Sequence, residues 1–167
     1  MVISQSNFTS NLEESLFNKI KTIVGTTYEH PSLGVRTVTF SGAYPADMEG
    51  DIAMLPLVIF TRGTKPRPTQ FSQGGPRKYT DVFYIEVIAG GYHDETANVF
   101  MKNAIVDLLL FGMDNKRFDF INYGTGAVEG QYQIDAYEVA RVPSNYNSVY
   151  ERNHAQIMIG TWLTITN

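Results

Sequence analysis

Two runs of residues that are apolar on both faces most strongly constrain how this chain can fold. Residues 55–60 (LPLVIF) are uninterrupted apolar sequence, as expected for a strand that is covered on both sides. Residues 79–88 alternate, but both alternating sets are apolar, with Val82 on one face and Phe83 on the other. We therefore predict two strands in the interior of a layered sheet, the second ending at Gly90.

Two helices are predicted from apolar side chains that recur with a period of 3.6 residues. The first covers residues 10–24, where Ser10 and Glu13 have the spacing of a capping box and Gly25 is placed to end the helix. The second begins at His93 or Asp94 and reaches about Phe111. Its predicted buried stripe, which Gly112 would end, consists of Ala97, Met101, Ala104, Ile105, Leu108 and Leu109.

The remaining sequence favours strands joined by turns. Residues 35–40 and 117–122 are short candidates, and residues 26–33 are expected to be a connection. Residues 131–142 and 154–166 alternate over longer runs, which predicts a long antiparallel hairpin. With 167 residues, 43% of them hydrophobic, the chain is expected to form one α+β domain over 1–167, with a mainly antiparallel sheet and two helices on one face.

Motifs for catalysis or metal binding are absent from the sequence. There is no cysteine, and none of the three histidines stands in a ligand-pair spacing. The His93-Asp94-Glu95 triplet is better explained by acidic residues in the first turn of a helix. The glycines at 124, 126 and 130 lack the dinucleotide-loop spacing and predict a hairpin turn. We therefore expect no enzyme activity, no cofactor and no metal.

Asp47, Glu49 and Asp51 are spaced like the beginning of a calcium loop. The sixth and twelfth positions of such a loop, however, hold Ile52 and Val58 in place of glycine and glutamate. These carboxylates are therefore interpreted as an acidic loop. The sequence also shows no signal-peptide pattern and no apolar run of about 20 residues, so no membrane partner is expected.

Residues 61–78 (TRGTKPRPTQFSQGGPRK) differ from the rest of the chain in charge and composition. They contain five of the 13 basic residues and no acidic residue, whereas the remaining sequence has eight basic and 17 acidic residues. Three prolines and three glycines exclude a helix there. A segment of this length without an apolar pattern is usually functional, which predicts a long hairpin arm that is ordered against a partner.

Three interpretations of this arm remain open. A neighbouring copy could supply the acidic residues Asp47, Glu49 and Asp51 as the opposite charge. DNA is an alternative, since basic residues beside Phe71 could contact phosphates and stack on a base, although the net charge of −4 disfavours tight binding. A solvated hairpin tip without a partner is the third. The candidate contact residues of the arm are Arg62, Lys65, Arg67, Phe71, Arg77 and Lys78.

The order of these elements resembles the tail terminator, or tail completion, proteins of tailed bacteriophages. The features that carry the resemblance are the early amphipathic helix, the PLVIF strand, the basic loop before KYTDVFYIEVIAGG, the ANVFMKNAIVDLLLF helix and the final QIMIGTWLTI strand. They span most of the chain but include no diagnostic motif. No residue role can be transferred from the family.

The resemblance implies a structural virion protein that is assembled in the host cytoplasm. Such a protein forms a hexameric ring on the last ring of the tail tube, ends polymerisation and joins the tube to the head connector. A different connector or baseplate adaptor is the alternative within the same class. A small enzyme or ligand-binding domain, with a pocket around Tyr92, His93 and Asp94, is the alternative outside it.

Overall fold

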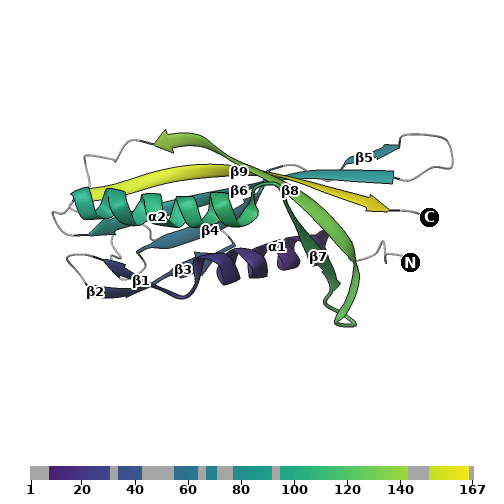
Figure 1. The fold of residues 1–167 in the computed structure, drawn as a ribbon, viewed down its shortest axis with the longest axis horizontal. Coiled ribbons are helices and arrows are strands. Elements are labelled where there is room, and N and C mark those ends of the chain that lie inside the picture. The colour runs from purple at the N-terminus through teal and green to yellow at the C-terminus, as the bar shows by residue number, and fades with distance from the viewer. Residues whose placement is uncertain are drawn as a thin grey trace.

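The protein forms a curled seven-stranded sheet with both helices on one face (Figure 1). The computed structural model describes residues 8–30, 34–42, 55–63, 67–70, 77–91, 95–142 and 151–165. Its elements in chain order are α1 (Phe8–Val24), β1 (Thr27–His30), β2 (Gly34–Thr37), β3 (Thr39–Ser41), β4 (Leu57–Arg62), β5 (Arg67–Gln70), β6 (Arg77–Gly91), α2 (Glu95–Met113), β7 (Lys116–Asn122), β8 (Ala127–Val142) and β9 (Glu151–Ile165). The α+β class and the two helices on one face, predicted from the sequence, are confirmed.

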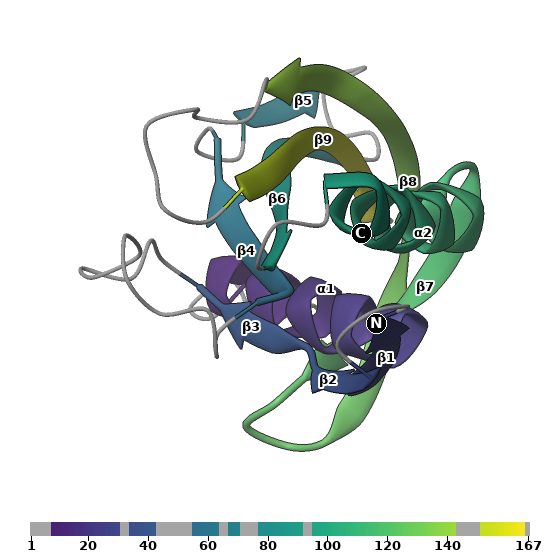
Figure 2. The same cartoon turned by 90° about the vertical axis from the view of Figure 1, so that its left-hand side faces the viewer.

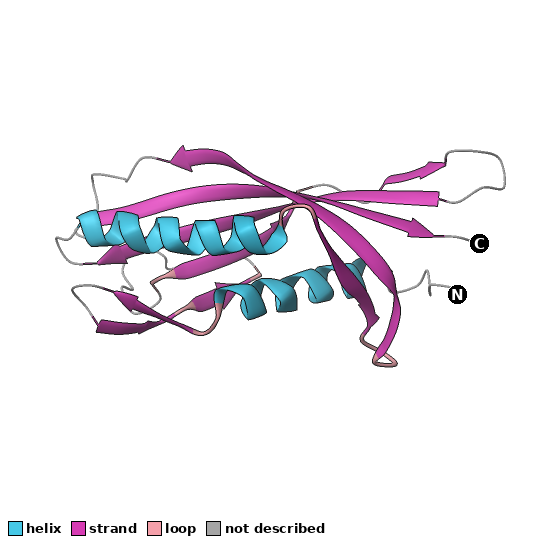
Figure 3. Ribbon diagram, viewed as in Figure 1, coloured by secondary structure: helices cyan, strands magenta, loops and turns pink. Residues whose placement is uncertain are grey.

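The strand order in the large sheet is β3-β4-β6-β9-β8-β7, and β5 pairs with β6 beside this path. All neighbours are antiparallel except β3 and β4, which are parallel. Figure 2 shows the sheet curling around α1 and α2, and Figure 3 shows both helices on the same side of the strands. Strands β1 and β2 form a separate two-stranded hairpin.

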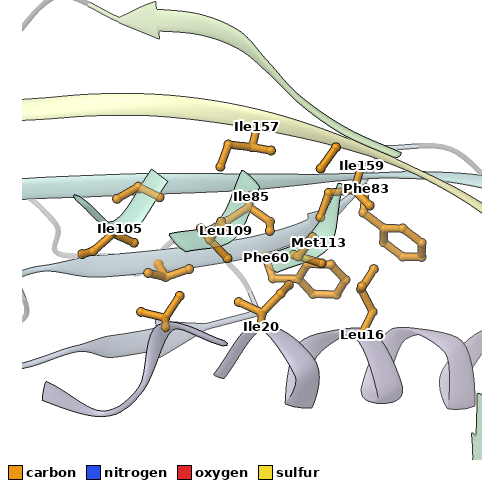
Figure 4. Packing of buried hydrophobic residues seen from close by; sticks show 14 of the residues in the cluster. Leu16, Ile20, Phe60, Phe83, Ile85, Ile105, Leu109, Met113, Ile157 and Ile159 are labelled. Atoms are coloured by element: carbon orange, nitrogen blue, oxygen red, sulfur yellow. The ribbon is translucent and has the colours of Figure 1, made fainter. Parts of the chain in front are cut away.

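Strands β4 and β6 are buried on both faces, as their sequences predicted. Phe60 and Phe83 stack on the helical face with ring centroids 5.2 Å apart, and they belong to the main core (Figure 4). On the opposite face, Ile59 and Ile88 are part of a second, smaller buried cluster. The central position of β6, between β4 and β9, explains why side chains on both of its faces are buried.

Helix α1 packs its predicted apolar stripe into the core. Leu12, Leu16 and Ile20 are fully or almost fully buried. Gly25 ends the helix with φ of 79°, and its amide donates to the carbonyl of Lys21 at 2.9 Å. Ser10 lies inside the helix, which begins at Phe8, so the predicted capping box is misplaced.

Helix α2 differs from its prediction at two positions. Leu108, expected in the core, is 45% exposed, whereas Val106 and Met113 are buried instead. Gly112 does not end the helix, which continues to Met113. Gly112 lies where α1 crosses α2, because a Cβ there would approach Cγ2 of Ile23 to 2.7 Å.

The short elements near the N-terminus are also more regular than expected. The predicted connection at 26–33 contains β1, which pairs with β2 from Thr27↔Thr37 to His30↔Gly34. The single strand predicted at 35–40 is divided into β2 and β3, because the chain leaves one hairpin and then joins the large sheet. The antiparallel pairing of β8 with β9 confirms the predicted long hairpin.

Candidate interaction surfaces

The basic segment 61–78 is largely continuous with the sheet in the part that the structure describes. Strand β4 extends through Arg62, and β5 pairs with the beginning of β6 from Arg67↔Thr80 to Gln70↔Arg77. Figure 1 shows β5 and the adjoining ends of β6 and β9 extending beyond both helices. The arm is therefore a strand hairpin that is paired within its own chain, and not a segment without internal partners.

Arg62 is bound inside the fold at the base of this hairpin. Its guanidinium donates to Oδ2 of Asp81 at 2.5 Å and to Oε1 of Glu13 at 3.0 Å. It also lies over the ring of Phe83, with 5.9 Å to the centroid. Arg62 thus joins β4, β6 and α1, which are distant in sequence.

The electrostatics of this group depend on the burial of Asp81. The side chain of Asp81 is 1% exposed, and loss of solvation raises the pKa of its carboxyl above the ordinary value of 3.8. Arg62 opposes this effect through its hydrogen bond and its charge, as does the amide of Val82, which donates to Oδ1 at 2.9 Å. Arg62 therefore offsets part of the effect of burial on this carboxyl group.

These contacts of Arg62 determine which basic residues of segment 61–78 can be substituted without disturbing the fold. If segment 61–78 contacts a partner, charge reversal at its basic residues should impair assembly, and Arg62, Lys65 and Arg67 are the first candidates in the sequence. Arg62→Glu would place a third carboxylate beside Asp81 and Glu13, so Arg62 has to be excluded from that test. The pairing of Arg62 does not test whether the segment contacts a partner.

The other predicted contact residues are placed only in part. The backbone of Arg67 lies in β5 and the backbones of Arg77 and Lys78 lie in β6. Five of the predicted residues lie outside the described part of the chain: Asp47, Glu49, Asp51, Lys65 and Phe71. Contact between the acidic loop and the basic segment stays a prediction.

An exposed apolar stripe on α2 was missed by the sequence prediction. Phe100 is 62% exposed and Phe111 81% exposed, with Leu108 and the partly buried Ala104 between them. Their spacing of three or four residues places them on one side of the helix. In the sequence, apolar residues occur on all sides of α2, and they are more numerous than one core-facing stripe requires. This excess could have indicated an exposed apolar surface. We call Phe100, Ala104, Leu108 and Phe111 the α2 stripe.

The stripe borders a shallow groove between the two helices. Ile23 of α1 and Gly112 of α2 line it, together with Ala104, Asp107, Leu108 and Phe111. The missing side chain at Gly112 permits the close approach of α1 that forms one wall. Large exposed aromatic residues beside a groove are typical of protein-binding surfaces.

His30 is buried, and its Nε2 lies 3.3 Å from Oδ1 of Asn98, which joins β1 to α2. His93 lies outside the described residues. Among the described residues, no group of three or more His, Asp or Glu could hold a metal ion.

Helix α2 also corrects the expectation about apolar runs. The 18 residues Thr96–Met113 have a mean hydropathy of 1.2, so the helix is long and apolar enough to cross a membrane by length and composition. Within the domain, however, 44% of this window is buried, and Met101, Ile105 and Leu109 lie in the main core. A core helix of a globular domain meets the same criteria, so these 18 residues are not evidence for a role in a membrane.

The similarity of this chain to known proteins lies in solved structures. No protein-family model and no curated protein matches the chain. One chain of a solved structure described as the virion of a native gene transfer agent (GTA) particle is similar, with a TM-score of 0.44 and 11% sequence identity. The similarity covers 96% of this protein and 100% of that chain. It is too weak to establish a shared family or a shared role.

Proposed function

We propose that this protein is a structural component of a tailed-phage virion and acts in it as a tail terminator. It assembles into a ring through contacts between protein surfaces, caps the tail tube and joins it to the head connector. The order of sequence elements that resembles the tail terminator proteins supports this role. A connector or baseplate adaptor with the same fold is the alternative within the class.

The observation that carries the proposal is the exposure of Phe100 and Phe111 on α2. An isolated domain gains nothing from leaving two phenylalanines on one helix face in water, because each large apolar side chain is worth about 1.5–3 kcal/mol when it is buried. A protein that assembles recovers this free energy at an interface. The β5–β6 hairpin, which extends beyond the helices, offers a second surface for contact.

Capping of the tail tube is tested by co-expressing the protein with the tail-tube protein encoded in the same genome. We expect tubes of limited length, with the protein at one end in electron micrographs, and long tubes when it is omitted. Tubes that are equally long with and without the protein, and that do not co-sediment with it, would reject the tail terminator role. Labelling the protein in whole particles distinguishes the tail end from the connector or the baseplate.

A further inference from the structure

We infer that the α2 stripe binds the β5–β6 hairpin of a second copy of this chain. The β5–β6 hairpin is defined here as Arg67–Gln70 together with its partner residues 77–80 of β6. The inference rests on the proposed function, in which copies assemble with one another, and names the two surfaces that meet. The contact is head-to-tail, because a helix face of one copy receives a strand hairpin of the next.

The α2 stripe is an exposed apolar surface on a rigid helix. Phe100, Leu108 and Phe111 are exposed along about three turns of one helix, and the groove beside Gly112 lies at their C-terminal end. These side chains are held by a rigid element, since Met101, Ile105 and Leu109 fix the opposite side of α2 in the core. A preorganised apolar surface loses little conformational entropy when a partner binds to it.

The groove beside the stripe carries a negative charge. Asp107 is exposed and lines the groove next to Leu108. Lys102, the basic residue of α2, is 6% exposed and belongs to the buried side. A partner that is apolar and basic therefore complements the α2 stripe.

The β5–β6 hairpin has that composition. It carries Arg67, Arg77 and Lys78 and no acidic residue, and its register pairs Pro68 with Tyr79. The hairpin extends past the ends of both helices, away from the main core (Figure 1). Within its own chain, the principal contacts of α2 are with β6, β9, β8, β1 and α1, and β5 is not among them.

A contact between two different surfaces of one chain has a geometric consequence. Each copy offers one stripe and one hairpin, so the contact repeats from copy to copy and either closes into a ring or continues as a filament. Opposite charges at the contact increase the rate of association and select its register, while the phenylalanines supply most of the affinity.

The test uses two variants of the full chain, each of which loses one surface. The stripe variant is Phe100→Ser with Phe111→Ser, and the hairpin variant is Arg67→Glu with Arg77→Glu and Lys78→Glu; Arg62 is left unchanged. In light scattering, the wild type is expected to form oligomers. Each variant should associate at least about 30-fold more weakly, as expected when interface hot spots are lost.

Mixing the two variants is the decisive step. The stripe variant retains an intact hairpin and the hairpin variant an intact stripe, so an equimolar mixture has one complete contact per pair and should form dimers. The matched control is Val35→Ser with Val128→Ser, which removes two exposed apolar residues outside α2 and should assemble like the wild type. Circular dichroism and urea denaturation confirm that each variant is folded.

Two results with the separate proteins, and one with the mixture, would overturn the inference. One is a wild type that stays monomeric at all concentrations. The other is assembly of both variants at the wild-type concentration. Neither result decides whether the protein caps tail tubes, because tube length is measured in a separate experiment. The failure of this contact is therefore distinguishable from the failure of the proposed function. Folded variants that stay monomeric even when mixed would also reject the head-to-tail contact.

Discussion

The hydroxyl of Ser15 on α1 accepts a hydrogen bond from the amide of Ile121 on β7, at 3.2 Å and across 106 residues of sequence. One turn earlier, Oδ1 of Asn11 accepts from the amide of Tyr123 at 3.2 Å. Ile121 belongs to β7, the last strand of the sheet, and Tyr123 follows directly after it, so in the described part of the chain no further strand lies on this side to accept from these amides. Asn11 and Ser15 are buried on the apolar side of α1, where their side chains accept hydrogen bonds from these two amides. Their position also blocks the addition of another strand at this edge of the sheet.

Ser15→Ala is therefore expected to destabilise the domain by about 1–3 kcal/mol, because it leaves the Ile121 amide without its acceptor. The free energy of unfolding in urea measures this loss. Ser10→Ala is the matched control, since Ser10 is exposed on the same helix and its loss should change stability by less than about 0.5 kcal/mol. Equal effects of the two substitutions would contradict the role of Ser15 as the acceptor for the Ile121 amide.

Arg62→Met is expected to cost about 3 kcal/mol at pH 7, because it leaves the carboxylate of Asp81 buried without its cation. The pKa of Asp81 is already raised by burial, and losing Arg62 removes what lowers it. A raised folded-state pKa favours the protonated form, so the penalty is absent below the ordinary pKa of 3.8 and grows as the pH rises through the folded-state pKa.

The stability gap between the wild type and Arg62→Met should therefore shrink as the pH is lowered from 7 towards 4. Urea denaturation across this range measures the gap. When Asp81→Asn is introduced into both proteins, the gap between them should no longer depend on pH over this range. A gap that stays constant with pH would show that the loss comes from packing and not from the carboxylate.

Gly112→Ala is expected to destabilise the protein by about 1–3 kcal/mol, in spite of the better helix propensity of alanine, because the new Cβ would overlap Ile23. Ile23→Ala removes the obstructing atoms. In a double-mutant cycle, the cost of Gly112→Ala should be smaller in the Ile23→Ala background than in the wild type. Strict additivity of the two changes would exclude a close crossing of α1 and α2 at Gly112.

Tyr132→Phe is expected to leave stability unchanged or to raise it by up to about 1 kcal/mol. The hydroxyl of Tyr132 is buried, and among the described residues it has no hydrogen-bond partner, while burial raises its pKa further above the ordinary value of 10.0. The ring packs against Phe118 with 6.0 Å between centroids, a contact that phenylalanine preserves. Thermal unfolding measures the change, and a loss above about 1 kcal/mol would reveal a partner for the hydroxyl.

The elements that depend on neighbours close in sequence were predictable. The core stripe of α1, its end at Gly25 and the two-faced burial of β4 and β6 follow from periods of 3.6 and 2 residues together with the special backbone freedom of glycine. The antiparallel hairpin of β8 and β9 follows from the same local patterns. For these elements, the amino-acid order alone determined both the conformation and the buried face.

Only the tertiary structure decided how distant residues meet. Arg62 looked like a free cation of a basic segment until the register of β4 with β6 placed it beside Asp81, and the approach of α1 brought Glu13 to the same guanidinium. Gly112 looked like a helix end until α1 crossed α2 there. Local sequence does not encode which segments become neighbours, because pairing and crossing are set by the packing of the whole core.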